Sequence, residues 1–228
     1  MTTAEGEASH PPGRARPAAT GCLYLSFDDG PDPRWTPRIL DLLAQAQARA
    51  TFFMVGCRAL AHAALARRVA AAGHVLGNHT YSHLHPWTLA SAAARREVRD
   101  GAAALADLTG VAPRWFRPPY GRLRRCMLDE AERGGQRLVL WNRSVVDWGL
   151  LGRARWIARR LAAAGPGEIV LMHDGARGSN RPGELVEVLP GFLADLGRRG
   201  LALVALPEAA PSPASSADRA ADSPRTQR

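Results

Sequence analysis

Short apolar segments alternate with longer helical patterns along most of this chain, and this alternation limits the possible folds more than any other feature. The apolar segments cover 22–27, 50–55, 74–78, 114–121, 137–141, 168–173 and 201–206. Apolar residues recur at helical spacing in 36–46, 63–73, 88–108, 124–133, 153–164 and 184–199. Because strands that are buried on both faces read as continuous apolar runs, this order predicts repeated βα units around a parallel sheet or a barrel. A count of about seven strands favours the barrel.

The chain is long enough to form one domain with a substantial core. It has 228 residues, of which 46% are hydrophobic, and a chain of that size can bury most of its apolar surface. The two ends, 1–20 and 207–228, are rich in Pro and Ser and show no apolar periodicity. We predict that they are disordered tails, which leaves 21–206 as the folded domain.

The charge of the chain indicates little about its partners. The net charge is +9, and all 30 basic residues are Arg. No dense Arg run is interleaved with aromatic residues, so we expect no nucleic-acid groove. Codon bias is the simplest explanation of the Arg content, although a basic surface can also steer anionic partners toward a protein.

The cysteines and the apolar runs exclude further classes of protein. Cys22, Cys57 and Cys126 are isolated and form no CxxC pair, so neither a disulfide framework nor a Cys-ligated zinc is predicted. The first thirteen residues lack the apolar region of a secretory signal. No apolar run is long enough to span a bilayer. We therefore expect a cytoplasmic protein without a membrane span.

Polar residues follow several predicted strands at the point where each strand ends. In YLSFDDGPDP, the adjacent acids Asp28 and Asp29 come directly after an apolar run, and two carboxylates held this close repel each other. His79 and Arg117 follow later strands, and His173 ends another. Since α/β folds build their sites at the carboxyl ends of the strands, these side chains are candidates for one site.

The stretch NHTYSH adds a second histidine, His83, four residues after His79. On one helical turn this spacing places two imidazoles side by side, although a chain with seven histidines can contain such a pair by chance. Three nitrogen or oxygen ligands with one open position define a catalytic zinc site. Either Asp28 or Asp29 can be the third ligand, which leaves the other carboxylate free to act as a base.

Three further stretches have both a structural and a functional interpretation. In RPPYG, Arg117 either holds the free carboxylate by a bidentate contact or lies on the surface beside a turn. In VVDW, the residues alone favour Asp147 as a helix N-cap with Trp148 in the core. In LMHD, a lone His173 at a strand end is more often packed or capping than catalytic.

In combination these motifs resemble one known family. FDDGP, HTYSH, FRPPYG, VDW and LMH occur in this order, each at a strand end. That series resembles the polysaccharide deacetylase family, the NodB-homology domain of the family 4 carbohydrate esterases, over roughly 22–206. The resemblance implies a distorted (β/α) barrel, in agreement with the strand count. One departure is Ser144, which stands where the fourth family motif usually opens with an acid.

The resemblance also implies a role for each motif residue. Asp28 would be the general base, and one divalent metal ion, usually zinc but also cobalt or another ion, would be bound by Asp29, His79 and His83. The other implied roles are Arg117 as tether of Asp28, Tyr120 as backbone donor to the oxyanion, Leu171 as contact of the acetyl methyl, His173 as general acid, Asp147 as its orienting partner, and Trp148 as wall of the sugar pocket.

The function implied by the resemblance is removal of N-acetyl groups from an N-acetylglucosamine-type amino sugar. A metal-bound water would attack the acetyl carbonyl, with Asp28 as base and His173 as acid. Two alternatives stay open at this point. One is an O-acetyl esterase, deformylase or small-metabolite deacylase on the same scaffold, and the other is a carbohydrate-binding module without catalytic activity.

Overall fold

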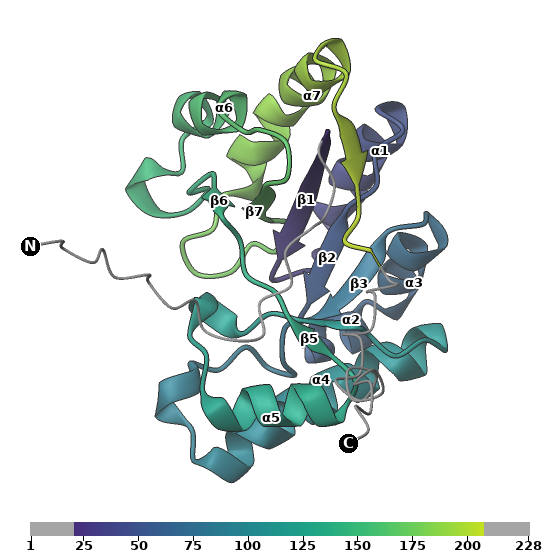
Figure 1. Cartoon of the computed structure of the whole chain (residues 1–228), viewed down its shortest axis with the longest axis vertical. Helices are drawn as coiled ribbons and strands as arrows, with labels where there is room; N and C mark the ends of the chain where they lie inside the picture. The colour runs from purple at the N-terminus through teal and green to yellow at the C-terminus, as the bar shows by residue number, and fades with distance from the viewer. Residues whose placement is uncertain (1–20, 208–228) are drawn as a thin grey trace, which may run out of the picture.

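The computed structural model describes residues 21–207 and shows one curved parallel sheet with helices outside it (Figure 1). The strands are β1 (Cys22–Asp28), β2 (Thr51–Met54), β3 (Val75–Asn78), β4 (Trp115–Phe116), β5 (Arg137–Leu138), β6 (Arg143–Ser144), β7 (Ile169–His173) and β8 (Ala202–Val204). The α-helices are α1 (Thr36–Gln45), α2 (Gly56–Ala61), α3 (Ala63–Ala71), α4 (Ser91–Thr109), α5 (Arg125–Arg133), α6 (Ala154–Ala162) and α7 (Pro182–Arg198). The predicted tail 1–20 and nearly all of 207–228 lie outside the described residues.

The sheet runs in the order β5-β4-β3-β2-β1-β7-β6, and β8 pairs with the first half of β1. Every ladder between these strands is parallel. This confirms the predicted α/β barrel class, with strands at all seven predicted places. No ladder among the described strands joins β5 to β6. Residues 139–142 instead carry the chain from one edge of the sheet to the other, which is the distortion of the barrel.

Both faces of β1 are buried, as its continuous apolar sequence indicates. Leu23, Leu25 and Phe27 belong to the core between the sheet and the helices α1 and α7. Because side chains alternate along a strand, Ser26 and Asp28 point to the opposite face, into the barrel, and both are buried. The strand therefore delivers an acid to the inside of the barrel at its carboxyl end.

Three short elements differ from the sequence-based expectation. The strand β6 consists of two polar residues and forms by pairing with β7, with Ser144 opposite Leu171, so its own side chains gave no strand signal. The apolar stretch 137–141 is a strand only over β5, because the chain turns across the barrel after Leu138. Helix α2 was also not predicted, since it has only six residues. None of the described helices combines the length and apolarity needed to cross a membrane.

Gly77 in β3 leaves room for a ring that supports the site. A Cβ atom added there would lie 2.4 Å from Cδ1 of Phe53, whose ring packs against the guanidinium of Arg117 at 4.0 Å. Overpacking a buried site usually costs about 1–3 kcal/mol. We therefore predict that Gly77→Ala lowers the free energy of unfolding by that amount in urea denaturation.

Gly191 provides the matched control for this substitution. It lies exposed in α7, and a Cβ atom there would meet no atom within 4 Å. Because Ala is a better helix former than Gly, Gly191→Ala is expected to keep or slightly raise the free energy of unfolding. Equal effects of the two substitutions would contradict the packing role of Gly77.

Candidate active site

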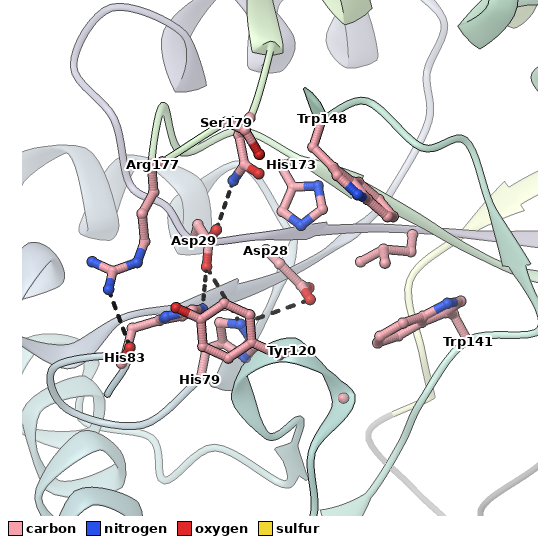
Figure 2. A pocket seen from close by; sticks show the side chains of 14 residues that line it. Asp28, Asp29, His79, His83, Tyr120, Trp141, Trp148, His173, Arg177 and Ser179 are labelled. Atoms are coloured by element: carbon pink, nitrogen blue, oxygen red, sulfur yellow. Dashed lines mark hydrogen bonds and ion pairs between the residues drawn. The ribbon is translucent and has the colours of Figure 1, made fainter. Parts of the chain in front are cut away.

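One cavity of about 660 Å³ opens where the strands of the barrel end, a volume suited to a small ligand. Figure 2 shows the side chains that line it. They are Asp28, Asp29, His79, His83, Tyr120, Gly121, Trp141, Trp148, Leu171, His173, Arg177, Gly178, Ser179 and Asn180. Eight of the ten residues predicted from sequence are in this set. The other two, Arg117 and Asp147, are wholly buried behind the cavity wall and contact lining residues.

Asp29, His79 and His83 form a compact group of possible metal ligands. Their ligand atoms lie within 4.8 Å of one another, and all three residues are buried. The Oδ1 atom of Asp29 lies 2.8 Å from Nε2 of His83 and 3.5 Å from Nε2 of His79 (Figure 2). The residue directly after β1 supplies the acid, and the loop after β3 supplies both histidines.

The chemistry of these three residues fits a divalent cation. Burial raises the pKa of Asp29, but its interactions with the two nearby imidazoles outweigh this effect and hold that pKa well below its usual range. Burial lowers the pKa of His83. The set therefore offers one carboxylate and neutral imidazole nitrogen, which is the ligand type that zinc and related ions take.

Neighbouring groups orient these ligands toward one point. The Nδ1 atom of His79 lies 2.7 Å from the carbonyl oxygen of Arg117. Since a carbonyl only accepts, Nδ1 carries the proton and the lone pair is on Nε2. Asn180 donates to Oδ2 of Asp29 at 2.7 Å. The other oxygen, Oδ1, is buried and has no hydrogen bond of good geometry to any described residue, as expected for an atom that binds a cation.

Asp28 is held by a buried guanidinium. Arg117 Nη1 donates to Oδ1 of Asp28 at 2.8 Å and to the Ser26 hydroxyl at the same distance. The other carboxylate oxygen, Oδ2, lies 3.8 Å from Nε2 of His79. The carboxylate is thus fixed by one oxygen and presents the second beside the possible metal ligands.

His173 and Asp147 form a second charged pair. Asp147 accepts from the backbone N–H of His173 at 2.7 Å, and its other oxygen lies 2.8 Å from Nδ1. Burial lowers the pKa of His173, but the Asp147 carboxylate more than offsets this and raises it to about 9. Because Nδ1 is engaged, Nε2 is the nitrogen available to the cavity. Trp148 packs edge-on against this ring, with 5.4 Å between the ring centroids.

Unusual backbone conformations gather at the site. Asp29, His83 and Tyr120 have φ values of 72°, 57° and 58°, a region that non-glycine residues rarely adopt. Such conformations persist where the surrounding structure imposes them, and they cluster at functional sites. In the described residues the Tyr120 N–H has no hydrogen-bond acceptor. Leu171, buried in β7, also lines the cavity.

Ser144 does not line the cavity. Its hydroxyl accepts a hydrogen bond from the backbone N–H of Val146 at 3.1 Å, and Val146 has a positive φ of 52°. Ser144 therefore stabilises the turn that leads to Asp147. The change from the usual acid leaves the carboxylate that contacts His173 in place.

No sequence motif predicted that the segment between β7 and α7, or the aromatic Trp141, contributes to the site. Arg177, Ser179 and Asn180 line the cavity, and Ser179 accepts a hydrogen bond from the Gly149 N–H at 3.0 Å. The only sequence signal for them is a Gly-rich polar run directly after a strand-end histidine. Such a run predicts a loop, but not which side chains it turns inward.

Comparisons with known proteins agree with this geometry. The sequence profile described as polysaccharide deacetylase matches residues 15–139, more than half of the chain. A peptidoglycan-N-acetylglucosamine deacetylase of Bacillus cereus is 35% identical over 188 residues, which cover 82% of this chain and 86% of the relative. A chitooligosaccharide deacetylase of Bradyrhizobium sp. is 35% identical over 200 residues, which cover 84% of this chain and 91% of the relative.

A solved structure supports the same relationship. It is a peptidoglycan N-acetylglucosamine deacetylase in complex with 4-naphthalen-1-yl-N-oxidanyl-benzamide. It superposes with a TM-score of 0.77 at 33% identity and covers 85% of this chain and 90% of its own. The chain therefore belongs to the polysaccharide deacetylase family, which confirms the resemblance inferred from the motifs.

The contact from Asn180 to Asp29 leads to a prediction about metal affinity. Asn180→Ala removes the donor that holds Oδ2, so Asp29 loses the orientation that presents Oδ1. Loss of such an orienting partner typically costs 10–100-fold in metal affinity. We expect that loss for Zn²⁺ in a chelator-competition titration. Asn142→Ala, outside the cavity, is the control, and equal affinities of the Asn180 variant and the wild type would contradict the orienting role.

The pair of His173 and Asp147 leads to a prediction about proton binding. In the metal-free protein His173 is expected to titrate near pH 9, because Asp147 raises its pKa to about 9. Asp147→Asn removes the charge and leaves burial dominant, so the pKa of His173 should fall by more than one unit, measured by NMR titration. A reaction that needs protonated His173 would then lose activity at lower pH than in the wild type. Asp41→Asn, a substitution at an exposed position, should leave the titration of His173 unaltered.

Proposed function

We propose that this protein is a metal-dependent hydrolase that removes the N-acetyl group from an N-acetylglucosamine-type amino sugar. The observation that carries the proposal is the meeting of three groups around one cavity: the ligand set of Asp29 and two histidines, the Asp28 carboxylate held by Arg117, and His173 paired with Asp147. The activities named for the two relatives are the same type of reaction.

We propose Zn²⁺ as the ion, because three nitrogen and oxygen ligands from Asp29, His79 and His83 with an open position are typical of catalytic zinc. When bound, such an ion lowers the pKa of a water molecule and offsets negative charge on the acetyl oxygen. Co²⁺ fits the same ligands, so affinity measurements with both ions are needed to rank them.

Asp28 is proposed as the general base. Arg117 occupies Oδ1, so Oδ2 is the oxygen free to take the proton from the water that attacks the acetyl carbon. The Arg117 guanidinium opposes the negative charge of the Asp28 carboxylate at 2.8 Å. It also keeps the carboxylate from turning away, because the guanidinium is itself fixed by buried contacts.

His173 is proposed as the general acid. The C–N bond breaks only if the nitrogen receives a proton, because an amide anion is too poor a leaving group. With Nδ1 bound to Asp147, Nε2 of His173 carries the proton that the departing amine accepts. The products are acetate and the free amine of the sugar.

The remaining predicted residues are proposed to bind the substrate. The Tyr120 N–H lacks an acceptor in the described structure and is suited to hydrogen-bond the acetyl oxygen as it becomes negative. Leu171 would contact the acetyl methyl group. Trp148 and Trp141 present aromatic faces to the sugar on one side of the cavity (Figure 2).

A binding module without catalysis does not explain this set of residues. Two buried charged pairs and a buried acid between two imidazoles cost free energy that sugar binding does not require. An O-acetyl esterase or small-metabolite deacylase would use the same residues, so substrate tests must separate these activities.

The proposal is tested by acetate release from the zinc-loaded protein. The substrates are chitooligosaccharides, peptidoglycan fragments, nucleotide-linked N-acetylglucosamine, acetylated xylan and small N-acetyl metabolites. We predict release from the amino sugars and a loss of roughly 10²–10⁴-fold in Asp28→Asn, the range that a general base contributes. The variant should still bind Zn²⁺, because Asp28 is not a proposed ligand.

Asp41→Asn removes an exposed acid on α1 and should retain full turnover. Full turnover by Asp28→Asn would refute the base assignment. Acetate release from xylan or small metabolites alone would show that the substrate is an ester or a metabolite and not an amino sugar. Full activity after chelation would refute the metal mechanism.

A further inference from the structure

We propose that Arg177 makes the site selective for amino sugars that carry an acidic group, a carboxylate or a phosphate, beside the acetyl-bearing ring. This inference rests on the proposed deacetylase function and specifies its substrate class. Arg177 belongs to the segment between β7 and α7 and lines the cavity. No sequence motif pointed to it.

The position of Arg177 places its charge across the cavity from the aromatic wall. Its side chain lies beside His83, whereas Trp148 and Trp141 lie on the other side of Asp29 and Asp28 (Figure 2). A sugar held against the two tryptophans, with its acetyl group at the proposed metal ligands, would therefore extend toward Arg177.

The other charges at the cavity already have protein partners. Asp28 pairs with Arg117, and Asp147 pairs with His173. Asp29 contacts the two imidazoles and Asn180. No carboxylate among residues 21–207 lies within the 4.0 Å ion-pair distance of the Arg177 guanidinium. Among the described residues, Arg177 is thus the cationic side chain at the cavity that has no acidic partner.

The guanidinium has donors left for a ligand. Its one hydrogen bond to a described residue runs from Nη2 to the His83 carbonyl oxygen at 3.2 Å. The other N–H groups remain, and a guanidinium binds carboxylate and phosphate oxygens in a bidentate geometry. Since Arg177 is half-buried, an anion bound there is less screened than one on the open surface.

The segment that carries Arg177 is held at several points. Asn180 donates to Asp29, Ser179 accepts from Gly149, and the Arg177 guanidinium contacts His83. These contacts place the charge before a substrate arrives, so less conformational entropy is lost on binding. A preorganised cation beside the reacting group can therefore select between neutral and acidic sugars.

The test compares three substrates that differ in charge. One is neutral di-N-acetylchitobiose, one is a disaccharide whose second N-acetyl sugar bears a carboxylate, and one is N-acetylglucosamine linked to a nucleotide diphosphate. Each is assayed for kcat/KM with wild type, Arg177→Gln and Arg177→Lys. Arg68→Gln, which removes one charge from an exposed position outside the cavity, is the matched control.

We expect Arg177→Gln to lower kcat/KM roughly 10–100-fold for one or both acidic substrates, the effect of losing a hydrogen bond to a charged group. The neutral disaccharide should lose less kcat/KM than the acidic substrates do, and Arg177→Lys should recover part of the loss. The difference between the carboxylate and the phosphate substrate identifies which acid the site takes. Arg68→Gln should change all three substrates little and equally.

An equal loss on neutral and acidic substrates would overturn the proposal and assign Arg177 a structural role through the His83 carbonyl. No loss on any substrate would also overturn it, and in both cases the deacetylase function would stand. If the wild type cleaves none of the three, the proposed function fails. In that case calorimetry with the same sugars tests the anion site on its own. Tighter binding of the acidic sugars that disappears in Arg177→Gln would support the anion site. Equal binding of neutral and acidic sugars by the wild type would refute it.

Discussion

The buried guanidinium of Arg117 is the contact on which the site and the closure of the barrel both depend. It donates to Asp28 and Ser26 of β1, and to the carbonyl oxygens of Val139 and Leu140 in the segment that crosses the barrel. The backbone carbonyl oxygen of Arg117 orients His79. A charge buried this completely is tolerated only with partners, and removal of one partner leaves the other uncompensated. Asp28, His79 and the edge-to-edge crossing are therefore coupled through one residue.

This coupling explains why the strained backbone lies where it does. Asp29 and Tyr120 hold left-handed conformations that cost free energy. Asp29 directly follows Asp28, which Arg117 holds, and Tyr120 lies three residues after Arg117 itself. The hydrogen bonds of Asn180 and the packing of the core supply the opposing stabilisation. The rigid barrel thus maintains a geometry that the local sequence does not favour, and that geometry gathers Asp29 and two imidazoles into one compact group beside Asp28.

Much of the fold and most of the site could be predicted from the sequence, for physical reasons. Strands buried on both faces must be apolar throughout, and strand-end residues such as Asp28 and His173 must meet at one edge. The local residues alone favoured Asp147 as a helix cap, whereas its carboxylate contacts His173, 26 residues away in sequence. Only the family resemblance indicated that contact. The two-residue strand at Arg143–Ser144 and the inward turn of Asn180 arise from long-range pairing, which no local pattern records.

The central position of β1 has a consequence for synthesis. It is the first strand of the described chain, it carries the proposed base, and it pairs on one side with β2 and on the other with β7. The contact between Ser26 and Val170 spans 144 residues. During translation β1 therefore keeps an open hydrogen-bonding edge until almost the whole domain has been made, and such an edge can pair with another chain. The strand that organises the chemistry is also the strand that is exposed longest to aggregation before the barrel closes.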